Sequence, residues 1–364
     1  MALLLNEIQW EAPILPAVND PEWEAEVKRR GGFVTQVDKR IAPNRCLREI
    51  WLQMLTYQPE EIPRRLFTLG ALVTSQENAC RYCYGANRAF LKLLGYSESF
   101  ISSIERDLRA AELDEKQHGF VAFCRNLARS RPRPVKADRE KLIALGYSPR
   151  AVNEMAFLIV AGCFTNRVGV LIACPPEQGL ERMTNGLLGT VMGLMAPVTT
   201  MLMNRKRVDS QSPQYRPDEL AAGAFGPVVA TLSGLSAAAI MKSALDGTFA
   251  SNTLSRPAKA LMFAIVARTL DCRHTEPEAR KLLQAEGVGD AEVESALQTL
   301  QSNRLSRSEA ALLPWTRDTV YYQTPVIQKR TRALAAEVGD TTMLEAIGVA
   351  ALANATVRLA MLLE

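Results

Sequence analysis

Residues 75–95, SQENACRYCYGANRAFLKLLG, contain two cysteines, Cys80 and Cys83, in a segment with a helical pattern. Residues three apart share one face of a helix, so the two sulfurs can form a disulfide without unfolding the helix. If the pair lies in the first turn, the helix dipole and unpaired N–H groups lower a thiol pKa, and Asn78 is the expected N-cap. A thiolate there attacks a peroxide oxygen to form a sulfenic acid, and the neighbouring thiol then closes the disulfide.

The same pair has two other interpretations. A CxxC is half of a tetrahedral zinc site, but zinc needs two further ligands, and the chain has only two histidines, His118 and His274, and no second CxxC. Alternatively, the two thiols are small buried core residues. That second interpretation is the one we favour for four other cysteines in apolar surroundings, namely Cys46, Cys124, Cys163 and Cys174.

The composition favours a cytoplasmic protein. Seven cysteines are scattered along 364 residues, and the start, MALLLNEIQWEAPILP, lacks the pattern of a secretory signal. A close cysteine pair in a reducing compartment is redox-active or metal-binding more often than structural. The net charge of +4 is small, and no basic tract is interleaved with aromatic residues, so we expect no nucleic-acid binding.

The chain repeats itself. With a shift of 192, several residues recur in register, and with a shift of 191 Glu154 falls on Glu345 and Arg167 falls on Arg358. The pairs at the shift of 192 are Arg64 and Arg256, Cys80 and Cys272, Arg88 and Arg280, Gly95 and Gly287, and Arg125 and Arg317. We therefore predict two copies of one domain, residues 15–180 and 205–364, joined by a connector at 181–204.

Both copies are predicted to be all-α. Apolar residues recur at three- and four-residue spacing, and alternating β-branched runs are missing. Gly95 and Gly146, each followed by Tyr-Ser, are expected to end helices, and Pro149 fits the first turn after an N-cap at Ser148. Each copy is expected to be a bundle of about six to eight helices.

The connector is unusually apolar. Residues 183–203 carry no charge, and this uncharged run is long enough to span a bilayer. Gly189 and Gly193 within it allow close helix approach. Asn185, several threonines and Pro197 favour burial against protein over membrane contact. The last helix, residues 344–363, contains Asn354 and Arg358 within its apolar run, so we interpret it as a core helix.

Residues 64–87, RRLFTLGALVTSQENACRYCYGAN, resemble the alkylhydroperoxidase D-like (AhpD-like), or carboxymuconolactone decarboxylase, family. The segment around Asn166 and Arg167 resembles its peroxidase-related branch, so the resemblance covers most of the first copy. It implies an all-helical fold, subunit packing through helices, and peroxide reduction recharged by an external dithiol donor, with Cys83 as the attacking thiol and Cys80 as the resolving one.

The chain departs from the family pattern at the three positions that form the usual proton relay of the family. The His of the family after the second cysteine falls on Asn87, its Glu on the preceding helix falls on Thr68, and a His often found between the cysteines falls on Tyr82. General acid–base help is worth about 10²–10⁴-fold, so we expect a slow enzyme unless His118 and Glu77 reach the site.

The second copy is degenerate. Cys272 has Thr275 where Cys83 would be, and Ala279 where the His would be, so His274 has no thiol pair to serve. A domain without its chemistry suggests that it supplies the half-interface that another subunit supplies in single-domain relatives. We therefore predict a fused pseudo-dimer.

Two functions follow as hypotheses. The first is a thiol-dependent oxidoreductase that reduces a hydroperoxide at Cys80 and Cys83, with His118 and Glu77 as candidate acid–base residues and with neither a cofactor nor a metal. A dithiol reductant protein and a homo-oligomer with helical interfaces are the expected partners. The second is a non-catalytic AhpD-like binding or assembly subunit that has lost the proton relay.

Overall fold

The computed structural model describes residues 2–108, 111–177, 179 and 215–364. Within these residues every regular element is a helix, which confirms the all-α prediction. The apolar connector at 183–203 lies outside the described residues.

The first half begins with a short 3-10 helix, η1 (Leu5–Glu7), and continues with nine α-helices in its described part. These are α1 (Pro21–Gly31), α2 (Gln36–Ile41), α3 (Arg45–Thr56), α4 (Arg64–Glu77), α5 (Arg81–Leu93), α6 (Glu98–Arg106), α7 (Glu115–Arg129), α8 (Lys136–Ala144) and α9 (Pro149–Leu171).

The second half contains nine α-helices within residues 215–364. These are α13 (Pro217–Ala221), α14 (Gly226–Ala230), α15 (Ser236–Ala250), α16 (Arg256–Thr269), α17 (Thr275–Ala285), α18 (Asp290–Thr299), α19 (Arg307–Asp318), α20 (Thr324–Val338) and α21 (Asp340–Met361).

Local sequence signals account for many helix starts. The Ser148 hydroxyl accepts from the N–H of Ala151 at the start of α9, with Pro149 in the first turn, as predicted. Asp114 and Ser306 begin α7 and α19 with capping boxes. Gly95 and Gly146 have φ values of 85° and 89°, the left-handed backbone expected after a helix end.

The helix starts repeat as the residues do. A shift of 192 carries the starts of α4, α6 and α7 onto those of α16, α18 and α19, and a shift of 191 carries the start of α9 onto that of α21. The turn before α5 repeats as well, because Ala79 and Asp271 both have a positive φ, of 45° and 53°.

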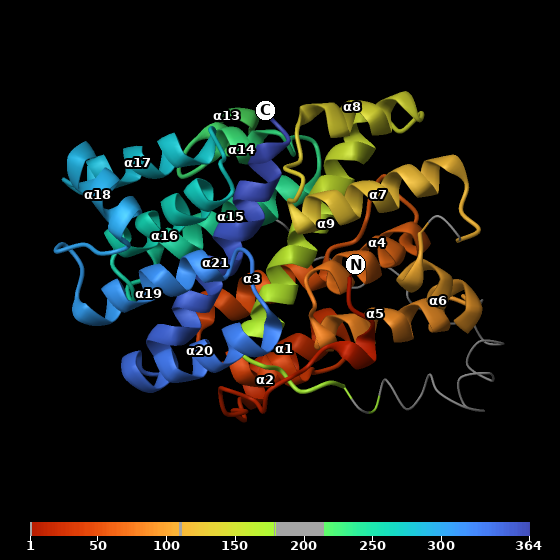
Figure 1. Cartoon of the computed structure of the whole chain (residues 1–364), viewed down its shortest axis with the longest axis horizontal. Coiled ribbons are helices and arrows are strands. Elements are labelled where there is room, and N and C mark those ends of the chain that lie inside the picture. Colours follow the sequence, from red (N-terminus) through yellow and green to blue (C-terminus); the bar gives the residue numbers. More distant parts are fainter. Residues whose placement is uncertain (1, 109–110, 178, 180–214) are drawn as a thin grey trace.

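Figure 1 shows the first-half helices α4 to α8 on one side of the molecule and the second-half helices α16 to α20 on the other, with α9 and α21 between them. α9 packs against α21, and α3 packs against α15, so helices at corresponding positions of the two halves meet at the centre.

Both central helices are apolar on nearly all sides. α9 and α21 have the length and hydropathy to cross a membrane, but 89% and 100% of their most apolar windows are buried inside the protein. A helix that is apolar all round belongs in a core or a membrane, and here the surrounding helices cover it. The prediction that the last helix is a core helix agrees with this burial.

Two buried arginines cross between the halves. Arg167 on α9 donates to the carbonyls of Thr319 and Val320, which follow α19. Arg358 on α21 donates to the carbonyl of Ala128 in α7, and the shift of 192 places Ala128 on Val320. The two contacts are therefore reciprocal.

Candidate functional site

The loop between α4 and α5 sets the position of the cysteine pair. Asn78 ends α4, Ala79 turns the chain with a φ of 45°, and Cys80 is the N-cap of α5. The prediction of Asn78 as the N-cap is therefore wrong. The left-handed turn at Ala79 separates the two helices, and it leaves Cys80 as the residue that caps the second one.

Cys80 and Cys83 lie in the first turn of α5, on one face, as free thiols. The backbone N–H of Cys83 donates to the Cys80 sulfur over 3.3 Å. Both sulfurs also lie against Gly169 of α9, where an added Cβ would be 3.3 Å from the Cys80 sulfur and 3.6 Å from the Cys83 sulfur. The missing side chain of Gly169 thus makes room for both thiols.

Burial decides the ionisation of Cys83. Cys80 is fully buried and Cys83 is 8% exposed. Burial raises the pKa of the Cys83 thiol well above its ordinary value, and the neighbouring Cys80 adds to the shift. The Cys83 thiol donates to the carbonyl of Thr165 over 3.9 Å, which favours the neutral form. The expectation of a lowered pKa is thus wrong for Cys83, because desolvation outweighs the helix N-terminus.

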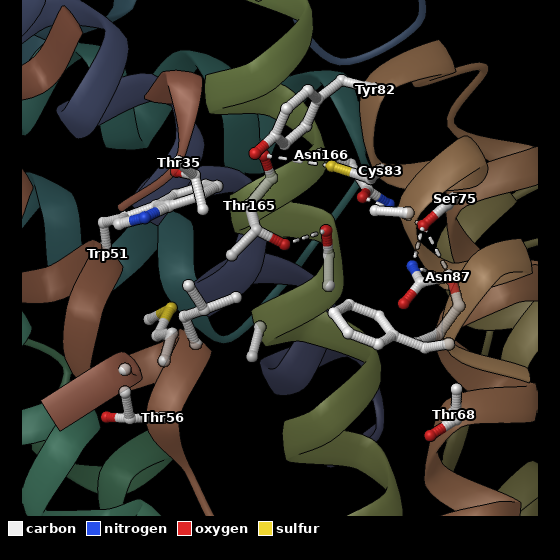
Figure 2. A pocket seen from close by; sticks show the side chains of 18 of the residues that line it. Thr35, Trp51, Thr56, Thr68, Ser75, Tyr82, Cys83, Asn87, Thr165 and Asn166 are labelled. Atoms are coloured by element: carbon white, nitrogen blue, oxygen red, sulfur yellow. Dashed lines mark hydrogen bonds between the residues drawn. The ribbon is translucent and has the colours of Figure 1, made fainter. Parts of the chain in front are cut away.

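The Cys83 sulfur faces a pocket of about 200 Å³ between α1, α3, α4, α5 and α9. Figure 2 shows Ser75, Cys83 and Asn87 on one side of this pocket and Thr35 and Trp51 on the opposite side. Aromatic and aliphatic side chains line much of the remaining wall; they include Phe33, Met54, Leu55, Phe67, Phe90 and Leu158.

A small polar network lies beside Cys83. The amide of Asn87 donates to the Ser75 hydroxyl over 2.9 Å, and Ser75 in turn contacts the carbonyl of Ala71 at 2.7 Å and Oδ1 of Asn166 at 3.2 Å (Figure 2). Asn166 is 1% exposed, and its Nδ2 has no hydrogen-bond partner among the residues that the structure describes. A buried amide without a partner is uncommon, so this group is suited to hydrogen-bond a molecule in the pocket.

A second polar contact uses the only carboxylate among the described residues that line this pocket. The Tyr82 hydroxyl donates to Glu177 over 3.0 Å, and the N–H of Gln36 donates to the same carboxylate oxygen over 2.6 Å. Burial raises the pKa of Tyr82 well above its ordinary value, so Tyr82 stays protonated at neutral pH.

The three positions at which the resemblance expects a proton relay all line the pocket. Thr68, Tyr82 and Asn87 surround the cavity that contains the Cys83 sulfur. None of these side chains exchanges a proton near pH 7. The structure therefore brings the expected positions together, with residues that hydrogen-bond in place of residues that titrate.

Glu77 and His118 are not among the residues of the Cys83 pocket. The Glu77 carboxylate pairs with Arg125 at 2.6 Å and with Arg129 at 2.8 Å. His118 on α7 is half-buried and lines a separate, shallow cavity together with Arg125 and Arg129. The sequence spacing left open whether these two residues reach the cysteines. In the fold, Glu77 pairs with arginines of α7, and His118 lies on α7 outside the Cys83 pocket.

The second half keeps the shape of the turn without the thiol pair. Cys272 is 2% exposed, and Thr275, at the position of Cys83, is fully buried. Elsewhere Cys124, Cys163 and Cys174 are buried, and Cys46 is half-buried. Among the described residues, no three His, Cys, Asp or Glu side chains are placed to hold a metal ion together.

Sequence reasoning missed Gly169, Thr165 and Glu177. Gly169 and Thr165 lie on α9, more than eighty residues after the cysteines, and Glu177 follows that helix. The glycine itself was one signal in the sequence for this contact, because the shift of 191 places Gly169 on Ala360, in the half that lacks the cysteine pair.

No protein-family model matches the chain, and no curated protein is similar enough to match it. The resemblance to the AhpD-like family therefore stays a prediction that rests on residues 64–87 and on the segment around Asn166.

Proposed function

We propose that the protein is a cytoplasmic thiol-dependent oxidoreductase that reduces a hydroperoxide at the Cys80–Cys83 pair. The observation that carries this proposal is the unequal placement of the two thiols. The Cys83 sulfur lines the pocket, whereas the Cys80 sulfur is fully buried behind it and accepts a hydrogen bond from the Cys83 N–H. One thiol is thus placed to meet a substrate and the other to resolve the product.

The reaction takes three steps. The Cys83 thiolate attacks the terminal oxygen of the hydroperoxide, the O–O bond breaks, and the leaving alkoxide takes a proton to give an alcohol and a sulfenic acid at Cys83. The Cys80 sulfur then displaces the hydroxyl as water and forms the disulfide. An external dithiol protein restores both thiols and is itself oxidised to a disulfide.

The residues of the pocket predict a slow reaction. Burial raises the pKa of Cys83, and Thr68, Tyr82 and Asn87 supply no group that takes up the thiol proton near pH 7. The Glu177 carboxylate in the lining already accepts hydrogen bonds from the Tyr82 hydroxyl and the Gln36 N–H. Without acid–base help the expected rate is about 10²–10⁴-fold below that of a site with a relay.

We also propose that the two halves form a fused AhpD-like pseudo-dimer in which the second half completes the interface of the first. The reciprocal contacts of Arg167 and Arg358 support this arrangement, as does the packing of α9 on α21 and of α3 on α15. A twofold-related interface exchanges the same contacts in both directions. Further copies of the chain would assemble through helical surfaces.

The proposal is tested by reacting the reduced protein with one equivalent of cumene hydroperoxide at pH 8 and mapping the oxidised cysteines by mass spectrometry. We expect one disulfide between Cys80 and Cys83 in the unmodified protein. Cys83→Ser should consume no peroxide, whereas Cys80→Ser should retain a sulfenic acid at Cys83.

Cys272→Ser is the matched control, because Cys272 corresponds to Cys80 in the second half and is similarly buried. This variant should react as the unmodified protein does. Peroxide consumption that survives Cys83→Ser, or two thiols that stay reduced in the unmodified protein, would exclude the enzymatic proposal.

The second candidate is a non-catalytic binding subunit that takes a small molecule in the same pocket. The unpartnered Nδ2 of Asn166 and the apolar walls favour it, because they suit an apolar molecule with one polar group. Two inert thiols together with quenching of Trp51 fluorescence by such a molecule would select this alternative.

A further inference from the structure

The turn that presents Cys80 is held in an unfavourable backbone conformation. Ala79 has a φ of 45°, a region that residues with a Cβ adopt only when the surrounding contacts fix them there. Its neighbours in the chain are Asn78, which ends α4, and Cys80, which begins α5. The position of Cys80 therefore depends on what holds residues 78 and 79.

Two side chains of the second half donate hydrogen bonds to this turn. The Tyr322 hydroxyl donates to the carbonyl of Asn78 over 2.9 Å, and the Thr324 hydroxyl donates to the carbonyl of Ala79 over 3.0 Å. Tyr322 lies in the link between α19 and α20, and Thr324 is the first residue of α20. Both are more than 240 residues away from the turn in the sequence. Neither of them lines the Cys83 pocket.

The first half contributes one further contact. Arg167 donates to Oδ1 of Asn78 over 3.4 Å, and its guanidinium carbon lies 5.8 Å from the centre of the Tyr322 ring. Arg167 also donates to Thr319 and Val320. The turn before Cys80 and the segment after α19 are thus joined through one buried cluster.

We infer that Tyr322 and Thr324 are positioning residues for the Cys80–Cys83 pair, so that the half without a thiol pair sets the redox behaviour of the half that has one. The inference rests on the proposed redox function of that pair. By fixing residues 78 and 79, the two hydroxyls keep the Cys80 sulfur beside Cys83 and raise the effective concentration of one thiol at the other. The same two hydroxyls also keep the Cys80 sulfur shielded from solvent and from reagents.

The experiment measures the equilibrium in which Cys80 and Cys83 lose two electrons and two protons to oxidised glutathione, giving a disulfide and two reduced glutathiones. Tyr322→Phe and Thr324→Val each remove one hydroxyl and nearly keep the side-chain shape. Loss of one such bond should lower the equilibrium constant for disulfide formation about threefold to tenfold. Thr324→Ser keeps the hydroxyl and should behave as the unmodified protein.

Tyr321→Phe is the matched control. Tyr321 lies in the same link, and its hydroxyl donates across the halves to the carbonyl of Ser130 over 3.1 Å, away from the cysteine turn. This variant should leave the equilibrium unchanged. A general loosening of the interface would instead lower the equilibrium constant for disulfide formation in Tyr321→Phe as much as in Tyr322→Phe. That result would overturn the inference.

A second readout separates this inference from the proposed function. Alkylation of Cys80 by iodoacetamide, followed by peptide mass spectrometry, needs no redox reaction and should be several-fold faster in Tyr322→Phe and Thr324→Val than in Tyr321→Phe. Faster alkylation in a protein that never forms the disulfide would keep the positioning role and reject the oxidoreductase. Unchanged alkylation and an unchanged equilibrium would reject the positioning role, whatever the protein does with peroxide.

Discussion

At the Cys83 sulfur, two opposing effects determine reactivity. The first turn of α5 favours a thiolate, but burial and the hydrogen bond to the carbonyl of Thr165 favour the neutral thiol. Burial is the larger effect, so the pKa is raised. Cys83 is placed as a nucleophile and yet is mostly uncharged at neutral pH.

The pH dependence of Cys83 follows from this shift. A thiol with a raised pKa holds little thiolate at pH 7, and the thiolate fraction grows about tenfold per pH unit below the pKa. The rate of alkylation of Cys83 by iodoacetamide should therefore keep rising through pH 9. A stopped-flow or quenched pH profile checks this, and a plateau below pH 8 would contradict the raised pKa.

Gly169 offers a test of the space around the two sulfurs. An alanine Cβ would approach both thiols, so Gly169→Ala should destabilise the protein by about 1–3 kcal/mol and slow disulfide formation. Urea unfolding and oxidation by glutathione disulfide measure the two effects.

Gly348→Ala is the control for this change. A Cβ at Gly348, on α21, would lie 3.3 Å from Cδ1 of Leu47, which is as close as the contact at Gly169 but involves no sulfur. It should affect stability without slowing oxidation. If both variants oxidise at the same rate, the proximity of α9 to the thiols has no chemical role.

At the scale of the helices, α9 organises the site and the first half together. Thr165, Asn166 and Gly169 on its C-terminal part face the cysteine pair and the pocket. Glu154, about three turns or more before them, is fully buried. It accepts hydrogen bonds from the Tyr57 hydroxyl and from three backbone N–H groups at residues 60–62. This carboxylate ties the loop before α4 to α9.

Glu154→Gln should therefore loosen the start of α4. The amide can accept at only one of its two positions, so at least one of these three N–H groups loses its partner. We expect a loss of about 2–4 kcal/mol in the free energy of unfolding. Urea denaturation measures it. Glu140→Gln, at an exposed position on α8, is the control and should change stability little; equal effects of the two variants would contradict the anchoring role of Glu154.

The second half uses its equivalent carboxylate differently. Glu345 on α21 pairs with Lys259 at 2.9 Å and accepts from Ser251 and the N–H of Leu254. Burial alone would raise the pKa of Glu345, but the hydrogen bonds and Lys259 lower it below its usual value. The two positions matched in the sequence thus anchor the same part of each half, with a lysine supplying a donor in one half and a tyrosine in the other.

For the whole molecule, the important contacts are those that join the halves. Arg167 and Arg358 are buried, donate to carbonyls across the centre, and share the carbonyl of Val320 as an acceptor. The apolar faces of α9 and α21 are covered mainly by each other and by their neighbours. Separating the halves would expose all of these groups to water.

A chain cut between the halves should therefore stay associated. We expect that a protease site inserted between residues 180 and 214, once cleaved, leaves two fragments that elute together in size-exclusion chromatography without denaturant. Fragments that separate as folded monomers would show that each half forms its own complete core. The fragments should separate in urea, where the buried surface no longer holds them.

The predictions from sequence succeeded where the signal is local. The three- and four-residue spacing of apolar side chains, the N-cap at Ser148 and the glycines at 95 and 146 predicted the helices and several of their ends. The N-cap at Asn78 failed because Ala79 adopts a conformation that residues with a Cβ rarely choose, and distant contacts from Tyr322 and Thr324 hold it there.

By itself the sequence determined an all-helical chain with repeated helix starts and two thiols in one helical turn, because helix formation and the i, i+3 spacing depend on neighbouring residues. Only the tertiary structure decided which thiol faces the pocket, which side chains replace the expected relay, and that burial raises the Cys83 pKa. These properties depend on desolvation and on contacts between residues far apart in the chain, and no local pattern encodes either of them.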